Sequence, residues 1–304
     1  MQLSVDLALK DALVGLFKDK QLLLIAVINA LILSAFSYYI ISSALHPLLS
    51  SLASTPANAG AQLGSIVGWF ISVLAIEIVV WLVSLFFVVA IMAKAYNGAK
   101  MGIMDALGYA ARRYLGALAV AILLALIATV PYIIVILSAI ASPILFLFLF
   151  VIYAVGIIYL SISLCVALPF SVLGRKGPVA SLTSSLAVVR GNWWRIFAIF
   201  FVIGIIYYII VLILEVPMLI EIFSPVTSVV HTAGAGGAVN GTTLSSQIFS
   251  GEEKAFSSPL FVVASFVGTL LYAWFIIALA SIYRQFQGPQ PKMQKGRKNV
   301  PAPA

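Results

Sequence analysis

The sequence predicts an all-α integral membrane protein with six transmembrane helices. Two of the three supporting observations are compositional: apolar residues make up 63% of the chain, and charged residues only 9%. Soluble domains average about 45–50% apolar and about 25% charged residues, so a water-soluble core could not bury this much apolar surface. The third observation is that the basic residues fall almost entirely on one side of the apolar segments.

The apolar segments are each long enough for the roughly 20 residues that cross a hydrocarbon core. They run over residues 21–45, 66–93, 115–140, 144–171, 196–222 and 259–283. A tight turn near Ser142 and Pro143 joins the third and fourth segments. A cleavable signal peptide is the alternative for the first segment, and small residues near Ala53 and Ala57 resemble a cleavage site. The first apolar run is longer than the roughly 7–15 residues of a signal peptide, so we expect it to remain in the mature protein.

The basic residues predict the topology. All of the 17 Lys and Arg residues except Lys254 precede the first segment, lie between segments two and three or four and five, or follow the sixth. Lys and Arg resist translocation and accumulate in cytoplasmic loops. We therefore expect a protein integral to the cell membrane, with both termini in the cytoplasm and residues 46–65 and 223–258 outside.

The net charge of +8 does not predict a nucleic-acid partner, because the basic residues are spread over loop ends and the tail. The predicted partners are the lipid bilayer and its anionic headgroups on the cytoplasmic side. Residues 285–304 are predicted to form a disordered basic tail. The headgroup contacts expected there are Lys292, Lys295, Arg297 and Lys298.

Few residues are suited to hold a metal or another cofactor. The single cysteine, Cys165, lies inside an apolar segment, which excludes an intramolecular disulfide and a thiol metal site. The two histidines, His46 and His231, are too few for a histidine-built metal site. No cofactor is predicted.

Residues 1–284 are predicted to form one polytopic domain built from three related units, about 1–94, 95–171 and 172–284. Asp11-Ala12-Leu13 recurs 94 residues later as Asp105-Ala106-Leu107, each before basic residues and an apolar run. The third copy, around Ser184-Ser185-Leu186, matches more loosely. Each unit would be a parallel hairpin preceded by a cytoplasmic interfacial amphipathic helix, near residues 3–19, 101–113 and 178–190. The alternative is that these segments are amphipathic only because loops beside spans are basic.

Three parallel hairpins are also typical of mitochondrial carriers. Their signature places acidic and basic residues after a proline in each odd helix, whereas Pro131 and Pro217 are followed by apolar residues. That resemblance fails. Inverted-repeat transporter folds are disfavoured because all three units enter from the same side.

The stretch from Leu168-Pro169-Phe170 through Ser181-Leu182 to Arg190-Gly191-Asn192-Trp193-Trp194 resembles another family. It is similar to the six-helix membrane domain attached to some glycerophosphodiester phosphodiesterases, which also occurs alone in bacterial and archaeal membrane proteins. The resemblance is best over residues 165–200. It implies a fold and a membrane location, but no activity, because the catalytic phosphodiesterase domain is absent from this sequence.

Glu77 is the candidate intramembrane polar site, because it is the one ionisable residue deep inside an apolar segment, about 16 Å from either helix end. Ionisation against lipid would be costly, so we expect Glu77 to face the bundle interior or to be protonated. It could be a proton or cation site. The favoured alternative is a protonated carboxyl that is hydrogen-bonded to a hydroxyl group such as that of Tyr38 or Ser34.

Small residues recur every four positions at the outer half of the second segment, and such a stripe lets helices approach closely. The candidate packing stripe consists of Gly60, Gly64, Gly68 and Ser72. Packing inside the protein is the favoured interpretation, and packing against a second subunit is the alternative.

Catalytic motifs such as G-x-S-x-G, H-E-x-x-H and a phosphate-binding Gly-rich loop do not occur in the sequence, so no enzyme activity is predicted. The predicted function is that of a non-catalytic scaffold or accessory subunit, with a membrane protein partner or a second copy of the chain. The alternative is a small-solute or lipid transporter or channel with Glu77 in the pathway. The scarcity of intramembrane polar residues favours the first.

Overall fold

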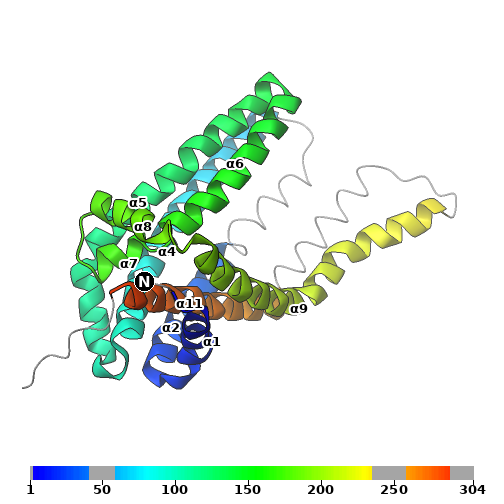
Figure 1. The fold of residues 1–304 in the computed structure, drawn as a ribbon. Coiled ribbons are helices and arrows are strands. Elements are labelled where there is room, and N and C mark those ends of the chain that lie inside the picture. Colours follow the sequence, from blue (N-terminus) through cyan, green and yellow to red (C-terminus); the bar gives the residue numbers. More distant parts are fainter. Residues whose placement is uncertain (1–2, 41–58, 235–257, 288–304) are drawn as a thin grey trace, which may run out of the picture.

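The structure is a computed structural model that describes residues 3–40, 59–234 and 258–287 (Figure 1). The described residues form helices joined by short turns, with no β-strand among them. The elements in chain order are α1 Val5–Lys18, α2 Lys20–Ile40, α4 Ala59–Asn97, the 3₁₀ helix η2 Gly98–Lys100, α5 Ile103–Ala141, α6 Pro143–Leu164, α7 Ala167–Val172, α8 Pro178–Val189, α9 Trp193–Gly234 and α11 Pro259–Gln287.

Six of these helices (α2, α4, α5, α6, α9 and α11) are long and apolar enough to cross a membrane, which confirms the six segments predicted from the sequence. The predicted tight turn is also present: Ser142 caps α6 by accepting a hydrogen bond from the Leu145 N–H, and Pro143 occupies the first turn. α4 and α9 are longer than predicted. They extend into residues 59–65 and 223–234, which the sequence assigned to outward loops; the remaining outward residues, 41–58 and 235–257, lie outside the described part of the chain.

The fourth apolar segment is not one helix. α6 ends at Leu164, and the separate short helix α7 follows from Ala167. Pro169 gives the physical reason, because a proline ring clashes with the carbonyl four residues earlier, here that of Cys165, and cannot donate to it. The break turns the chain so that α7 packs against α8 and α5.

Two of the three segments expected as interfacial helices, 3–19 and 178–190, are short helices of their own, α1 and α8. The third, 101–113, is not separate: it is the first part of α5, which continues unbroken to Ala141. α1 is ended by Asp19, whose backbone is extended, whereas no proline or capping residue interrupts α5 near Tyr114. Tyr114 instead ties this part of α5 to α4 by donating to the Leu82 carbonyl oxygen at 2.9 Å.

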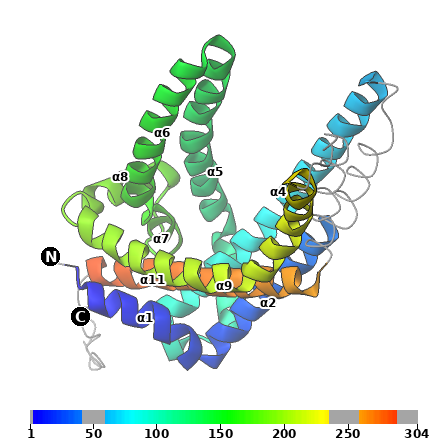
Figure 2. The ribbon, with the colours of Figure 1, turned by 90° about the vertical axis from the view of Figure 1, so that its right-hand side faces the viewer.

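α11 is the central helix of the described structure, and it contacts α1, α2, α4, α7 and α9. Its buried face is rich in small and apolar side chains, including Ala273, Ile277 and Ala280. The α5–α6 hairpin leans away from this centre: Figure 2 shows its tip well separated from the far ends of α4 and α9. The packed core therefore lies where the helices converge.

The helices converge at one end of the molecule, which we call the basic end. It comprises α1, α7, α8, η2, the first parts of α2, α5 and α9 and the last turns of α4 and α11, and every Lys and Arg of the described residues lies in or beside these elements. Hydrogen bonds tie the elements together there: Arg195 of α9 donates to the Leu3 carbonyl oxygen at 3.0 Å, and Tyr109 of α5 donates to that of Val172 at 2.7 Å.

Candidate functional site

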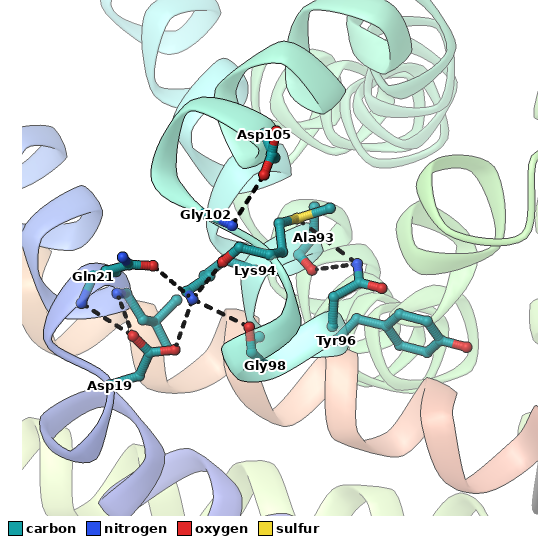
Figure 3. A network of polar contacts seen from close by, with 12 residues as sticks. Asp19, Gln21, Ala93, Lys94, Tyr96, Gly98, Gly102 and Asp105 are labelled. Atoms are coloured by element: carbon teal, nitrogen blue, oxygen red, sulfur yellow. Dashed lines mark hydrogen bonds and ion pairs between the residues drawn. The ribbon is translucent and has the colours of Figure 1, made fainter.

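Lys94 forms the most concentrated polar site of the described structure (Figure 3). It lies in the last turn of α4, and its side chain is only 1% exposed. The ammonium nitrogen Nζ lies 3.1 Å from Asp19 Oδ2 and donates to Gln21 Oε1 at 3.0 Å. It also reaches the carbonyl oxygens of Gly98 at 3.1 Å and Met101 at 2.6 Å. A buried ammonium needs this many partners, because burial removes its hydration.

Two local features of the chain build this environment. Asp19 separates α1 from α2, and its Oδ1 accepts hydrogen bonds from the N–H groups of Gln21 at 3.0 Å and Leu22 at 3.2 Å, so that it caps α2 while Oδ2 faces Lys94. Gly98 has φ +60°, a left-handed conformation that glycine adopts without strain. The turn it makes directs its carbonyl oxygen and that of Met101 back at the end of α4.

A second cluster of polar side chains lies beside the Lys94 site and joins α11 to α1 and α4. Ser281 donates to Asp11 Oδ2 at 2.7 Å, and the guanidinium of Arg284 lies 3.8 Å from the same oxygen. Arg284 also donates to the backbone carbonyl oxygens of Ala95 and Tyr96, the latter at 2.9 Å. A single side chain of α11 thus holds α1 and the end of α4 together.

The Lys94 site and this second cluster line a common cavity of about 170 Å³, which we call the lysine cavity. Its walls come from α1, α2, α4, η2 and α11, elements that are distant in the sequence. Its lining residues include Asp11, Asp19, Lys94, Ser281 and Arg284. Both signs of charge are present and are paired with each other. The arrangement is suited to holding five elements in register.

Glu77, the candidate intramembrane site, has an exposed side chain on α4. It does not face the packed interior, and it has no hydrogen-bond partner among the described residues. Ser34, one of the expected partners, donates instead to the Ala30 carbonyl oxygen of its own helix at 2.7 Å. The expectation that Glu77 faces the bundle interior is thus not met in the described structure, and its protonation stays a prediction.

The small-residue stripe is described in part. Gly68 is exposed, and a Cβ atom added there would meet no atom within 4 Å. Ser72 is also exposed and donates to the Gly68 carbonyl oxygen at 2.9 Å. No close helix contact requires a glycine at position 68. For Gly60 and Gly64 the structure describes the helical backbone but not the surroundings of the residues. Lys292, Lys295, Arg297 and Lys298 lie in residues 288–304, outside the described part of the chain.

Three buried polar atoms have no hydrogen-bond partner in the described structure: Asn29 Oδ1, Ser171 Oγ and Trp274 Nε1. Asn29 and Trp274 belong to α2 and α11, which pack against each other. Among the described residues, no group of three or more His, Cys, Asp or Glu side chains could hold a metal ion. Cys165 lines an apolar cavity of about 290 Å³ between α5, α6 and α11.

Sequence reasoning missed the lysine cavity, because it treated Lys94 and Arg284 as two among many topology markers. The available signal was Asp19, an acidic residue among the basic residues that precede the first span, together with the Asn97-Gly98 turn directly after the second. Nothing in the sequence states that these two segments meet.

The described structure thus has six helices long and apolar enough to cross a membrane, and three of them, α2, α4 and α11, meet at a buried polar cluster. Comparison with protein-family models, with curated proteins and with solved structures finds no match for the chain. The similarity to the glycerophosphodiester phosphodiesterase membrane domain therefore rests only on the residues that carry it.

Proposed function

We propose that the chain is a non-catalytic scaffold or accessory subunit of a membrane assembly, embedded in the cell membrane with its basic end in the cytoplasm. In this proposal the basic end is the fixed part of the molecule, because its charged side chains bind one another and backbone carbonyls. The α5–α6 hairpin is the part that meets a partner.

The observation that carries the proposal is the lack of packing on the hairpin. In Pro143–Val172, no residue of the most apolar 18-residue stretch is buried, whereas 39% of the corresponding stretch in Pro259–Gln287 is buried. Phe148 and Val155 on α6 are 63% and 66% exposed. Such a hairpin in a bilayer is surrounded by lipid or by the helices of another protein, and association through helix surfaces is common among membrane proteins.

The second candidate function is transport, and the exposed carboxyl of Glu77 on α4 is the observation that favours it. An ionisable group within a span is a candidate for a proton or cation pathway. The lysine cavity, the apolar cavity beside Cys165 and the cavity at the start of α9 are not lined by Glu77, so this candidate ranks second.

Site-specific photo-crosslinking in cells tests the scaffold proposal. A benzophenone side chain in place of Val155 on α6 should give a discrete protein adduct, which mass spectrometry identifies as another membrane protein or a second copy of the chain. The matched control is Ile213 on α9, which is 65% exposed and equally apolar. Lipid adducts alone at both positions would contradict a partner on the hairpin.

Proteoliposomes separate the two candidate functions. If the chain is a scaffold, Glu77→Gln leaves folding and the Val155 adduct unchanged, since an amide keeps the shape and most hydrogen bonds of a protonated carboxyl. Loss of a proton- or cation-dependent solute uptake in the same variant, with the fold retained, would establish transport instead.

A further inference from the structure

The turn between α8 and α9 borders a cavity of about 450 Å³, a size within the roughly 300–1,000 Å³ typical of ligand pockets. We call it the arginine cavity. Its lining contains two arginines and no carboxylate. The lining residues are Tyr159, Arg190, Gly191, Asn192, Trp193, Trp194 and Arg195. A cavity with two guanidinium groups and no acidic side chain has a positive potential, which favours an anion.

The two arginines retain free hydrogen-bond donors. Arg190 follows the last residue of α8 and is exposed, and its guanidinium has no hydrogen-bond or ion-pair partner in the described part of the chain. Arg195 uses one donor for the Leu3 carbonyl oxygen at 3.0 Å. A guanidinium has five N–H donors, so most of those of Arg195 remain available. Two such groups around one cavity suit the oxygens of a phosphate, which arginine binds in a bidentate manner.

The aromatic side chains connect the cavity to the membrane-facing surface. Trp193 is stacked between Tyr159, with ring centroids 5.7 Å apart, and Phe197, at 5.4 Å. Phe197 stacks in turn on Phe201, at 5.6 Å, which is 54% exposed. Trp194 is 74% exposed. Tryptophan is enriched at the membrane–water interface, because its ring is apolar and its N–H is polar.

We propose that the arginine cavity binds a phosphate group, and that the phosphate is the headgroup of an anionic phospholipid. Arg190 and Arg195 would hold the phosphate oxygens. The acyl chains would lie along the exposed face of α9, where the stacked rings of Trp193, Phe197 and Phe201 continue from the cavity. This apolar continuation is what favours a lipid over free phosphate as the source of the group. The site is separate from the hairpin surface proposed for a partner.

Native mass spectrometry of the full-length protein in detergent tests the proposal, with phosphatidylglycerol, phosphatidylcholine and inorganic phosphate as probes. We expect the wild-type protein to retain phosphatidylglycerol in preference to phosphatidylcholine. Arg190→Gln removes a charge and a bidentate donor, so the affinity for phosphatidylglycerol should fall by about tenfold, as expected for a charge-assisted hydrogen bond of about 1.5 kcal/mol. Arg190→Lys keeps the charge and should lose less.

Arg112→Gln is the matched control, because Arg112 is an exposed arginine of the basic end that does not line the cavity. It should leave phosphatidylglycerol binding within about twofold. Equal loss in the Arg112 and Arg190 variants would overturn the site, and so would equal retention of the two lipids by the wild type without binding of inorganic phosphate. A different result would keep the site but overturn the lipid as the source of the phosphate. In that result the wild type binds inorganic phosphate, Arg190→Gln does not, and phosphatidylglycerol is not preferred over phosphatidylcholine. Because Arg190 is exposed, an unchanged size-exclusion profile is expected for its variants.

Discussion

Lys94 shows how differently residues of one type are used within the same charge pattern. Lys10 and Lys20 are exposed, as expected for residues that mark a cytoplasmic loop, but Lys94 is almost completely buried. Removing an ammonium from water costs several kcal/mol, and only close partners offset this cost. The four partners of Lys94 come from two stretches of the chain, residues 19–21 and 98–101, so the free energy of their interaction depends on correct packing of the start of α2 against the end of α4.

Asp19→Asn should destabilise the protein. Asparagine still caps α2, so the change isolates the loss of the negative charge beside Lys94. Breaking a fully buried ion pair costs about 3–5 kcal/mol. Asp19 is 28% exposed, so we expect a smaller loss of about 1–3 kcal/mol in the free energy of unfolding, measured by denaturant unfolding in mixed micelles.

The control is Asp6→Asn, which neutralises an exposed carboxylate in the first turn of α1 and should change the free energy of unfolding by less than about 1 kcal/mol. The double variant Asp19→Asn, Lys94→Met should recover stability relative to Asp19→Asn alone, because no unpaired buried charge remains. If Asp19→Asn and Asp6→Asn behave alike, the ion pair does not stabilise the fold.

The two aspartates that the sequence repeat aligns have different roles. Asp11 accepts from Ser281 and lies beside Arg284, which joins α1 to α11. Asp105 accepts a hydrogen bond from the Gly102 N–H at 3.3 Å and so caps α5. Equivalent sequence positions therefore fix one helix against a neighbour in the first unit and begin a helix in the second.

At the scale of elements, the α7–α8 connection is packed against the end of α11 with no spare room. Gly174 lies in this connection, and a Cβ atom added there would be 2.6 Å from Tyr283 Oη and 2.7 Å from the Phe170 carbonyl oxygen. The Phe170 and Tyr283 rings also meet edge to face, with centroids 5.1 Å apart. The glycine is needed because two elements meet its backbone directly.

Gly174→Ala should therefore destabilise the protein by about 1–3 kcal/mol, the usual range for overpacking. The carbonyl of Phe170 is part of α7 and cannot move without shifting that helix. Thermal unfolding in detergent would report the loss as a lower Tm. Gly108→Ala on α5 is the control, because a Cβ there meets nothing within 4 Å and alanine favours a helix. A Tm for Gly174→Ala equal to or above that of Gly108→Ala would contradict the packing argument.

Hydropathy was sufficient to predict the six long helices, because each apolar run exceeds the length of a span and is bounded by polar or turn residues. The ends of the helices were predicted less well. α5 continues through Arg112 and Arg113 because these residues have high helix propensity and no proline lies within the next four turns. The break between α6 and α7 depends on Pro169, which lies inside an otherwise continuous apolar run.

At the scale of the whole molecule, the sequence shows that Lys and Arg gather on one side of the apolar segments, but it does not predict the contacts that form the lysine cavity. The lysine cavity unites residues as distant as Asp11 and Arg284, and this proximity follows from the packing of α11 against α1 and α4 rather than from any spacing. Composition fixes which residues must avoid water, but not which helices cover one another.

The orientation of the whole molecule in the membrane is the last prediction. The described Lys and Arg residues gather at the basic end, and positively charged segments resist translocation, so we expect the basic end in the cytoplasm.

After replacement of Cys165 by serine, single cysteines at Asp105 and Thr183, both exposed at the basic end, should not react with an impermeant maleimide in intact cells. Cysteines at Thr55 and Asn240 should react, because the charge pattern puts them outside. Permeabilised cells provide the control, in which Asp105 and Thr183 cysteines must become labelled. Labelling of either position in intact cells would invert the topology and would place the arginine cavity in the outer leaflet.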